Sequence, residues 1–422
     1  MQRRYLRFMA AGVAAVMTFT ISGCGAGPDD DVTIQLVAAD YGDREVNSSQ
    51  KYWGELAREF ESQHPGISID VNVYSWSEVD RKVAEMVERG EAPDIAQIGA
   101  YADYAAADKL YSADQLLSIP AQADFLPGLA EAGEVHRVQY GLPFAASTRL
   151  LFYNKTLFAK AGIEQPPKSW EDLQKAASAL KESGVKMPYA LPLGPEETQA
   201  ETMMWMLSGD GGYTDAINTY IIDSPENAQT FEWLRDELVG KGLTGTDPAA
   251  LNRQDAFDAF ARGDVGMLNG HPTLMQQAEK HGVKYGMAPL PGKDGEATAT
   301  MGVADWLMAF KKKNGHRDEV GKFLDFVYSE KSVLKLAEQY DLLPVTTAAS
   351  EAMRADKGNK HLWEFLDQLP NAAFYPSNKT SWAGVSKAVK EEMGTVVQPD
   401  GDPGSVLSRI QRDAMALDSA TG

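Results

Sequence analysis

The sequence has little cysteine, little positive charge and no long apolar run, and each shortage excludes a class of protein. A single cysteine in 422 residues allows neither a disulfide within the chain nor a cysteine-based zinc site. The 40 Lys and Arg against 60 Asp and Glu give a net charge of −20, which argues against binding to nucleic acid. The length exceeds what one compact core usually holds, so we expect about two domains.

The parts that catalytic and metal sites need are also missing. The six histidines never fall at the spacing that places two on one helix face around a metal. A phosphate-binding loop is not matched at Gly286 to Lys293, because five residues separate Gly286 from Gly292 where four are needed. We expect no metal, no cofactor and no covalent catalysis. Only a pair of carboxylates, which is all that a glycosidase needs, stays open.

The N-terminus has the pattern of a secretory signal. Arg3, Arg4 and Arg7 precede an apolar run over 8–21, which is shorter than the roughly 20 residues of a membrane span. The run ends in Ile21-Ser22-Gly23-Cys24, which resembles the lipobox of bacterial lipoproteins. That resemblance implies a signal peptide over 1–23, a lipid on Cys24, a tether over 24–31 and a place on the outer face of the cell membrane. An ordinary secretory signal with an incidental cysteine is the alternative.

Hydrophobic periodicity predicts the fold class. Alternating or β-branched segments at 32–38, 67–73 and 95–98 enclose two segments of helical spacing, at 52–60 and 79–87. Strand, helix, strand, helix, strand is typical of an open parallel α/β sheet. Ser169 and Asp172 predict a capping box for a helix over 170–180. The last helix is expected over 382–393.

Several short motifs occur in an order known from one family. They are Phe60-Glu61-x-x-His64-Pro65-Gly66-Ile67, Gly90-x-x-Pro93-Asp94-Ile95, Gly141-Leu142-Pro143-Phe144, Phe152-Tyr153-Asn154-Lys155, Pro166-Pro167-x-Ser169-Trp170, Phe260-x-x-Gly263-x-Val265 and Ala288-Pro289-Leu290-Pro291. With this set the chain resembles the carbohydrate-binding solute receptors of ABC importers, the family typified by maltose-binding protein. The resemblance covers nearly the whole mature chain.

The resemblance implies two hinged lobes, each with a mainly parallel sheet flanked by helices, that close on a ligand. The N-terminal lobe is expected over 32–145 plus 302–345, and the C-terminal lobe over 146–301 plus 346–422. Crossing strands are expected near 143–146, 300–303 and Pro344. A membrane permease would recognise the closed form, and no bond in the ligand would change.

A sugar presents C–H faces to aromatic planes and a rim of hydroxyls to polar groups. The resemblance places an aromatic platform at Trp382, with Tyr375 just upstream, although Trp382 as a core residue is the alternative. Asp305-Trp306 interrupts the apolar run 301–310. A charged side chain there is costly unless it is satisfied, which predicts Asp305 as a ligand acceptor.

Further candidates follow strands, where open α/β sheets present ligands. For Asp40 and Tyr41, which follow the first strand, a solvated loop is the alternative. One of Glu196, Glu197 and Glu201 is expected to reach the cleft. His271 is expected to form a hydrogen bond. The complete set of ligand-binding candidates is Asp40, Tyr41, Trp76, Tyr101, Glu197, Glu201, Asn269, His271, Asp305, Trp306, Tyr375 and Trp382.

These candidates include several carboxylates but no matching pair of arginines, which disfavours an anionic ligand. A neutral disaccharide or oligosaccharide is therefore the main expectation, with an amino sugar or another solute second. A lipid-anchored carbohydrate-active enzyme is a distant alternative. The expected partners are a carbohydrate and ABC permease subunits, with the membrane contacted through the lipid alone, no nucleic acid, and a monomeric chain.

Overall fold

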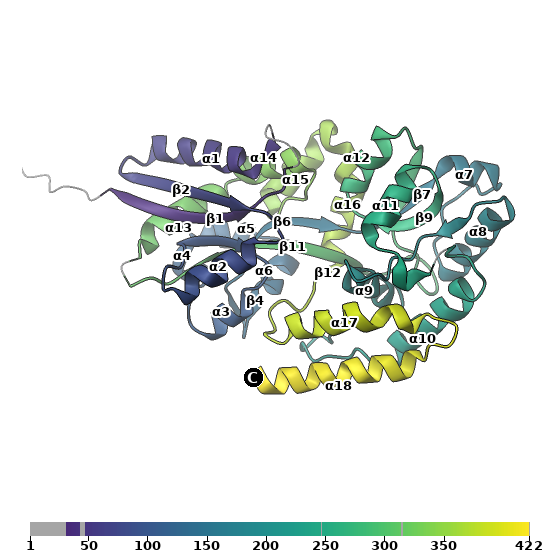
Figure 1. Cartoon of the computed structure of the whole chain (residues 1–422). Coiled ribbons are helices and arrows are strands. Elements are labelled where there is room, and N and C mark those ends of the chain that lie inside the picture. The colour runs from purple at the N-terminus through teal and green to yellow at the C-terminus, as the bar shows by residue number, and fades with distance from the viewer. Residues whose placement is uncertain (1–30, 43–46, 246, 314, 422) are drawn as a thin grey trace, which may run out of the picture.

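Two β-sheets organise the chain, as the computed structural model in Figure 1 shows. The structure describes residues 31–42, 47–245, 247–313 and 315–421. The predicted signal peptide, the lipidation site Cys24 and most of the predicted tether lie outside these ranges. Within them, no helix is both long and apolar enough to cross a membrane.

The first sheet has the strand order β12-β11-β3-β1-β2, with β6 paired to β11. Its strands are β1 (Val32–Ala39), β2 (Ile67–Tyr74), β3 (Ile95–Ile98), β6 (Leu142–Thr148), β11 (Thr300–Ala309) and β12 (Ala372–Ala373). β1 runs parallel to both β2 and β3, which confirms the parallel core predicted from periodicity. All three strands therefore end at the same edge, and the loops that follow them lie together.

Helices cover this first sheet. α1 (Ser49–Gln63) begins where Ser48 accepts a hydrogen bond from the Lys51 amide, and it buries Tyr52, Trp53 and Phe60. The other helices around this sheet are α2 (Val79–Glu88), α3 (Ala102–Ala106), α4 (Ala113–Leu116), α5 (Ile119–Asp124), α6 (Pro127–Ala132), α13 (Arg317–Val327) and α14 (Glu330–Tyr340). A small hairpin of β4 (Glu134–Val135) and β5 (Val138–Gln139) lies beside them.

The second sheet has the order β10-β7-β9-β8. Its strands are β7 (Leu150–Asn154), β8 (Met187–Tyr189), β9 (Val265–Gly270) and β10 (Tyr285–Ala288). β8 and β9 are parallel, whereas β7 runs antiparallel to both β9 and β10. This sheet is therefore mixed, where a mainly parallel one was expected, because β7 arrives from β6 in the other sheet and pairs between β9 and β10 against their direction.

The helices around the second sheet include the predicted capping box of α8, where Ser169 and Asp172 cap each other's backbone. They are α7 (Lys155–Lys160), α8 (Trp170–Glu182), α9 (Thr198–Ser208), α10 (Pro225–Trp233), α11 (Arg253–Ala261), α12 (Thr273–Lys280), α17 (Trp382–Val396) and α18 (Pro403–Thr421). The expectation that 382–393 is the last helix was wrong, because α18 follows. Its Leu407, Ile410 and Ala414 are buried at helical spacing.

The two sheets are connected through adjacent extended segments. β6 and β11 pair antiparallel from Gly302 opposite Thr148 to Leu307 opposite Leu142. A third segment joins them, because Ala146 and Leu343 exchange two backbone hydrogen bonds of 3.1 and 2.7 Å. These segments are the ones that the resemblance implied as crossing strands. α15 (Thr347–Ala355) and α16 (Trp363–Gln368) follow the third segment, and their buried side chains join apolar residues of both sheets in one cluster.

Candidate functional site

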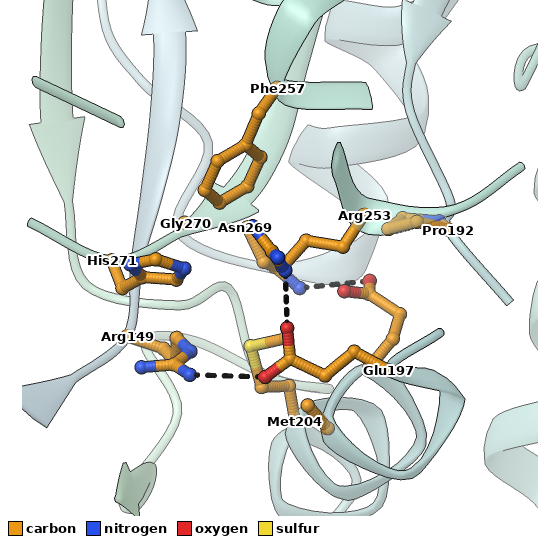
Figure 2. Close-up of a pocket in the computed structure, with 11 residues that line it drawn as sticks. Arg149, Pro192, Glu197, Met204, Arg253, Phe257, Asn269, Gly270 and His271 are labelled. Atoms are coloured by element: carbon orange, nitrogen blue, oxygen red, sulfur yellow. Dashed lines mark hydrogen bonds and ion pairs between the residues drawn. The ribbon is translucent and has the colours of Figure 1, made fainter. Parts of the chain in front are cut away.

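A polar pocket lies at the edge of the second sheet, beside the crossing strands (Figure 2). Its walls come from the end of β9, the segment before α9, the first two turns of α9 and α11, and the single residue between β6 and β7. The lining residues are Arg149, Pro192, Glu197, Ala200, Glu201, Met204, Arg253, Phe257, Asn269, Gly270 and His271. The free space between them is about 10 Å³, room for about one water molecule.

Arg149 is a buried arginine held in place by its neighbours on the crossing strands. It is 5% exposed, and its Nη1 donates to Ser147 Oγ at 3.1 Å. Its backbone carbonyl accepts a 2.8 Å hydrogen bond from Thr300 Oγ1 on β11. Its Nη2 lies 3.5 Å from Glu197 Oε1. Arg149 therefore couples the crossing strands to the loop before α9.

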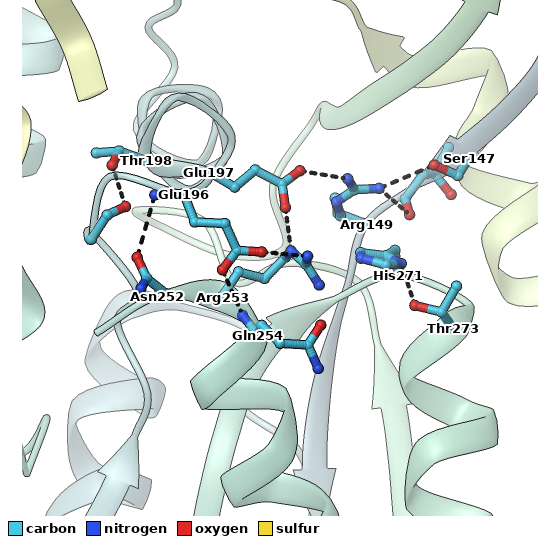
Figure 3. A network of polar contacts seen from close by, with 12 residues as sticks. Ser147, Arg149, Glu196, Glu197, Thr198, Asn252, Arg253, Gln254, His271 and Thr273 are labelled. Atoms are coloured by element: carbon cyan, nitrogen blue, oxygen red, sulfur yellow. Dashed lines mark hydrogen bonds and ion pairs between the residues drawn. The ribbon is translucent and has the colours of Figure 1, made fainter. Parts of the chain in front are cut away.

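Arg253, at the first position of α11, faces the same loop (Figure 3). Its Nη2 contacts Glu196 Oε1 at 2.6 Å and its Nε forms an ion pair with Glu197. The guanidinium also lies over the Phe257 ring, 5.1 Å from its centroid. Glu197 thus bridges Arg149 and Arg253, while Glu196 pairs with Arg253 alone.

Glu201 is a buried carboxyl group one turn into α9. Its Oε1 accepts from Trp205 Nε1 at 2.8 Å, from Asn269 Nδ2 at 3.2 Å and from the Tyr189 hydroxyl at 3.4 Å. Burial raises the pKa of Glu201 to about 8, although the three donors act in the opposite direction. Glu201 is consequently uncharged for the most part at neutral pH.

His271 closes the pocket beside the arginines. Burial, followed by the charges of Arg149 and Arg253, holds its pKa well below the ordinary value. Its ring lies 5.0 Å from the Phe257 ring, and Nδ1 lies 2.9 Å from Thr273 Oγ1. A neutral imidazole carries one donor and one acceptor nitrogen, which suits a hydrogen bond to a hydroxyl group.

The edge of the first sheet brings together another set of predicted residues. The Tyr41 hydroxyl donates to Asp305 Oδ2 at 2.6 Å and accepts from Gln97 Nε2 at 2.6 Å. Burial raises the pKa of Asp305 to about 6. The Tyr41 ring meets Trp76 edge-on at 5.5 Å, and Trp76 is 39% exposed, so an aromatic face is open to solvent beside a carboxyl group.

Trp382 and Tyr375 also lie together. Their rings stack at 5.2 Å and 28°, and Tyr213 meets Trp382 edge-on at 5.0 Å. Burial, followed by the charge of Glu197, raises the pKa of Tyr375 well above its usual value. This aromatic group is therefore a neighbour of the polar pocket that contains Arg149, Arg253 and Glu197, the arginine–glutamate pocket. Trp382 is only partly buried.

Two of the predicted residues, Tyr101 and Trp306, lie outside the pocket. Tyr101 is fully buried and its hydroxyl donates to the Ala132 carbonyl at 2.6 Å. Trp306 is 3% exposed and packs edge-on against Tyr101 at 5.4 Å. Both side chains are buried in the core of the first sheet, which argues against the prediction that they contact the ligand.

Other expectations about the carboxylates also change. Asp40 Oδ1 accepts from the Gly42 and Ser49 amides, at 3.0 and 2.9 Å, and so connects the end of β1 to the start of α1. None of the glutamates at 196, 197 and 201 is a free surface group, because two bind Arg253 and the third is buried. The expectation that no arginine pair stands beside them was wrong as well. Arg149 and Arg253 carried no sequence signal, since neither lies in a motif and folding alone brings them together.

Within the described residues, no group of three or more His, Cys, Asp or Glu side chains is placed to hold a metal ion. What the pocket offers is a dense set of hydrogen-bond donors and acceptors near aromatic rings. That combination suits the binding of a polar organic molecule.

Comparison with known proteins defines the class. Residues 45–334 match the model of the bacterial extracellular solute-binding protein family. The chain belongs to this family, whose members are binding proteins of ABC importers and not enzymes.

Individual relatives agree with this assignment. A binding protein of Brucella abortus (strain 2308) is 26% identical over 419 residues, covering 98% of this chain and 99% of the relative. The sn-glycerol-3-phosphate-binding periplasmic protein UgpB of Escherichia coli (strain K12) is 32% identical over 227 residues, half of each chain. The crystal structure of the cyclic alpha-maltosyl-1,6-maltose binding protein from Arthrobacter globiformis has a TM-score of 0.79 at 19% identity, covering 92% of this chain and 99% of that one. The fold is therefore the two-lobe fold of these receptors, as expected.

Proposed function

We infer that the chain captures an uncharged sugar, a disaccharide or short oligosaccharide, between its lobes and delivers it to the permease of an ABC importer. The observation that carries this proposal is the balanced ion-pair group of Arg149, Glu196, Glu197 and Arg253, set beside the Tyr375–Trp382 stack. The stack offers a plane for C–H faces, and the ion pairs offer donors and acceptors to hydroxyl groups.

Charge balance supports a neutral ligand. Two guanidinium groups face two carboxylates, Glu201 is mostly protonated and His271 is neutral at pH 7. An anion entering this pocket would compete with carboxylates already bound to the arginines. The maltose-type ligand named for the Arthrobacter structure is of the same neutral class.

A second candidate is a glycerol phosphate, favoured by the 32% identity to UgpB over half of the chain. The presence of Arg149 and Arg253 in one pocket is compatible with it. An amino sugar is a third, because an ammonium group would pair with the Asp305 carboxyl group, which accepts a hydrogen bond from the Tyr41 hydroxyl.

A thermal-shift screen of the mature chain separates these candidates. Neutral mono-, di- and oligosaccharides, glucosamine and sn-glycerol 3-phosphate would be tested at matched concentrations. A ligand present at 100 times its dissociation constant stabilises the folded chain by about 2.7 kcal/mol. A rise in Tm with a neutral saccharide supports the proposal. A rise with the phosphate or the amine alone refutes it, and release of shortened sugar products would indicate an enzyme.

The proposed receptor also has a lipid anchor, a tether and two lobes. A lipid on Cys24 would hold a monomeric receptor on the outer face of the membrane, with 24–31 as its tether. Replacing Cys24 by Ala should release the protein from the membrane fraction into the medium. The lobe boundaries stay as proposed from the sequence, with 32–145 and 302–345 forming one lobe and 146–301 and 346–422 the other.

A further inference from the structure

Two consecutive glutamates neutralise the arginines of the pocket. Glu196 and Glu197 precede α9, and both reach Arg253 across the pocket wall, while Glu197 also reaches Arg149. The position of Glu196 is fixed by both its backbone and its side chain. The Glu196 amide donates to Asn252 Oδ1 at 3.3 Å, and Glu196 Oε2 accepts from the Gln254 amide at 3.0 Å.

The ion pairs among Arg149, Glu197 and Arg253 are largely shielded from solvent, so a change in their net charge would act strongly on the pocket. The side chain of Arg149 is 6% exposed, and those of Glu197 and Arg253 are 24% and 25% exposed. Water screens such charges less than it screens surface ions, so each missing carboxylate would leave a guanidinium charge acting on the pocket. Glu201, the other carboxyl group among the described residues that line the pocket, does not replace Glu197, because burial raises its pKa to about 8 and its Oε1 already accepts from three neutral donors.

We propose that Glu197 sets the charge selectivity of the receptor: its carboxylate occupies the anion-binding faces of Arg149 and Arg253, and so excludes phosphorylated and carboxylated ligands. The inference rests on the proposed function, because it explains how a pocket with two arginines accepts an uncharged sugar. It also gives Glu197 a role different from that of a free hydrogen-bond acceptor for a ligand.

The test replaces Glu197 by Gln, which keeps the side chain's size and removes its charge. Binding of inorganic phosphate and of sn-glycerol 3-phosphate would be measured by isothermal titration calorimetry at low and high ionic strength. Glu171→Gln is the matched control, because Glu171 pairs with Lys175 on the exposed face of α8 in the same lobe. It removes one negative charge away from the pocket.

The expected result is at least a tenfold gain in affinity for both anions in Glu197→Gln, reduced by added salt and absent in Glu171→Gln. The double variant Glu197→Gln/Arg253→Gln restores the balance and should lose the gain. Circular dichroism verifies folding, and if Glu197→Gln does not fold, Glu196→Gln provides the same comparison. Equal anion affinity in the folded variant and in the native chain would overturn the inference. That outcome is independent of the sugar screen, which tests the proposed function with the unaltered protein.

Discussion

The hydroxyl of Tyr41 donates a 2.6 Å hydrogen bond to the carboxyl group of Asp305, and this contact joins the end of β1 to the strand β11. Gln97, near the end of β3, donates to the same tyrosine oxygen. One oxygen of Asp305 is thereby oriented by its neighbours. A ligand acceptor held in this way costs little conformational entropy when it binds.

The Asp305 contact leads to a prediction on affinity. Asp305→Asn should weaken sugar binding by about tenfold or more, because hydrogen bonds to charged groups contribute about 1.5–3 kcal/mol. The native chain should also lose affinity as the pH falls through 6, where Asp305, whose pKa is about 6, becomes protonated. Titration calorimetry between pH 5 and 8 measures both effects. A native affinity independent of pH, with Asp305→Asn unchanged, would remove Asp305 from the site.

Glu201 predicts a pH dependence of stability. Its pKa rises from 4.5 in the unfolded chain to about 8 in the folded one, so the folded state binds more protons between these values. Stability therefore falls as the pH rises from 4.5 to 8, by an amount on the order of 4 kcal/mol at most. Glu201→Gln, which resembles the protonated form, should show a smaller fall. Urea unfolding at several pH values tests this, and parallel curves for the two proteins would contradict it.

The exposed face of Trp76 predicts a loss of affinity without a loss of stability. Trp76→Ala removes a ring that is 39% exposed and touches Tyr41 edge-on. Stacking against a sugar face is the role that such an exposed ring can fill, so affinity should fall several-fold while Tm changes little. Trp76→Phe, which keeps an aromatic plane, should retain more of the affinity. Unchanged binding in Trp76→Ala would show that this ring does not contact the ligand.

Trp306 should behave in the opposite way. Trp306→Ala creates a cavity beside Tyr101 and should lower the free energy of unfolding by about 3–5 kcal/mol. The folded fraction should bind sugar with near-native affinity, because the ring faces the core. Denaturant unfolding followed by calorimetry below the transition separates the two quantities. A selective loss of affinity at native stability would return Trp306 to the site.

Local patterns predicted the fold well where a single segment contained the whole signal. The alternation over 67–73 and the Pro65-Gly66 break fixed β2 and the end of α1, and Ser169 with Asp172 fixed the start of α8. The direction of β7 was less predictable, because strand direction depends on where a chain re-enters a sheet.

The site was harder to predict because it depends on contacts between distant segments. Arg149 lies between β6 and β7 and Arg253 begins α11, and only the folded chain shows that Glu197 bridges them. Trp306 was predicted to contact the ligand because it follows Asp305 directly in the sequence. Successive residues of a strand point to opposite faces, so a strand that presents Asp305 to Tyr41 places Trp306 in the core.

The central claim is that the ligand bound between the lobes, beside the arginine–glutamate pocket, is an uncharged sugar and not an anion. The most direct measurement is isothermal titration of the mature chain with the neutral saccharide that raises Tm most and, side by side, with sn-glycerol 3-phosphate. We predict a saturable isotherm for the saccharide, weakened by Trp382→Ala, and no detectable heat of binding for the phosphate. Tight binding of sn-glycerol 3-phosphate with no response to any neutral saccharide would contradict the account.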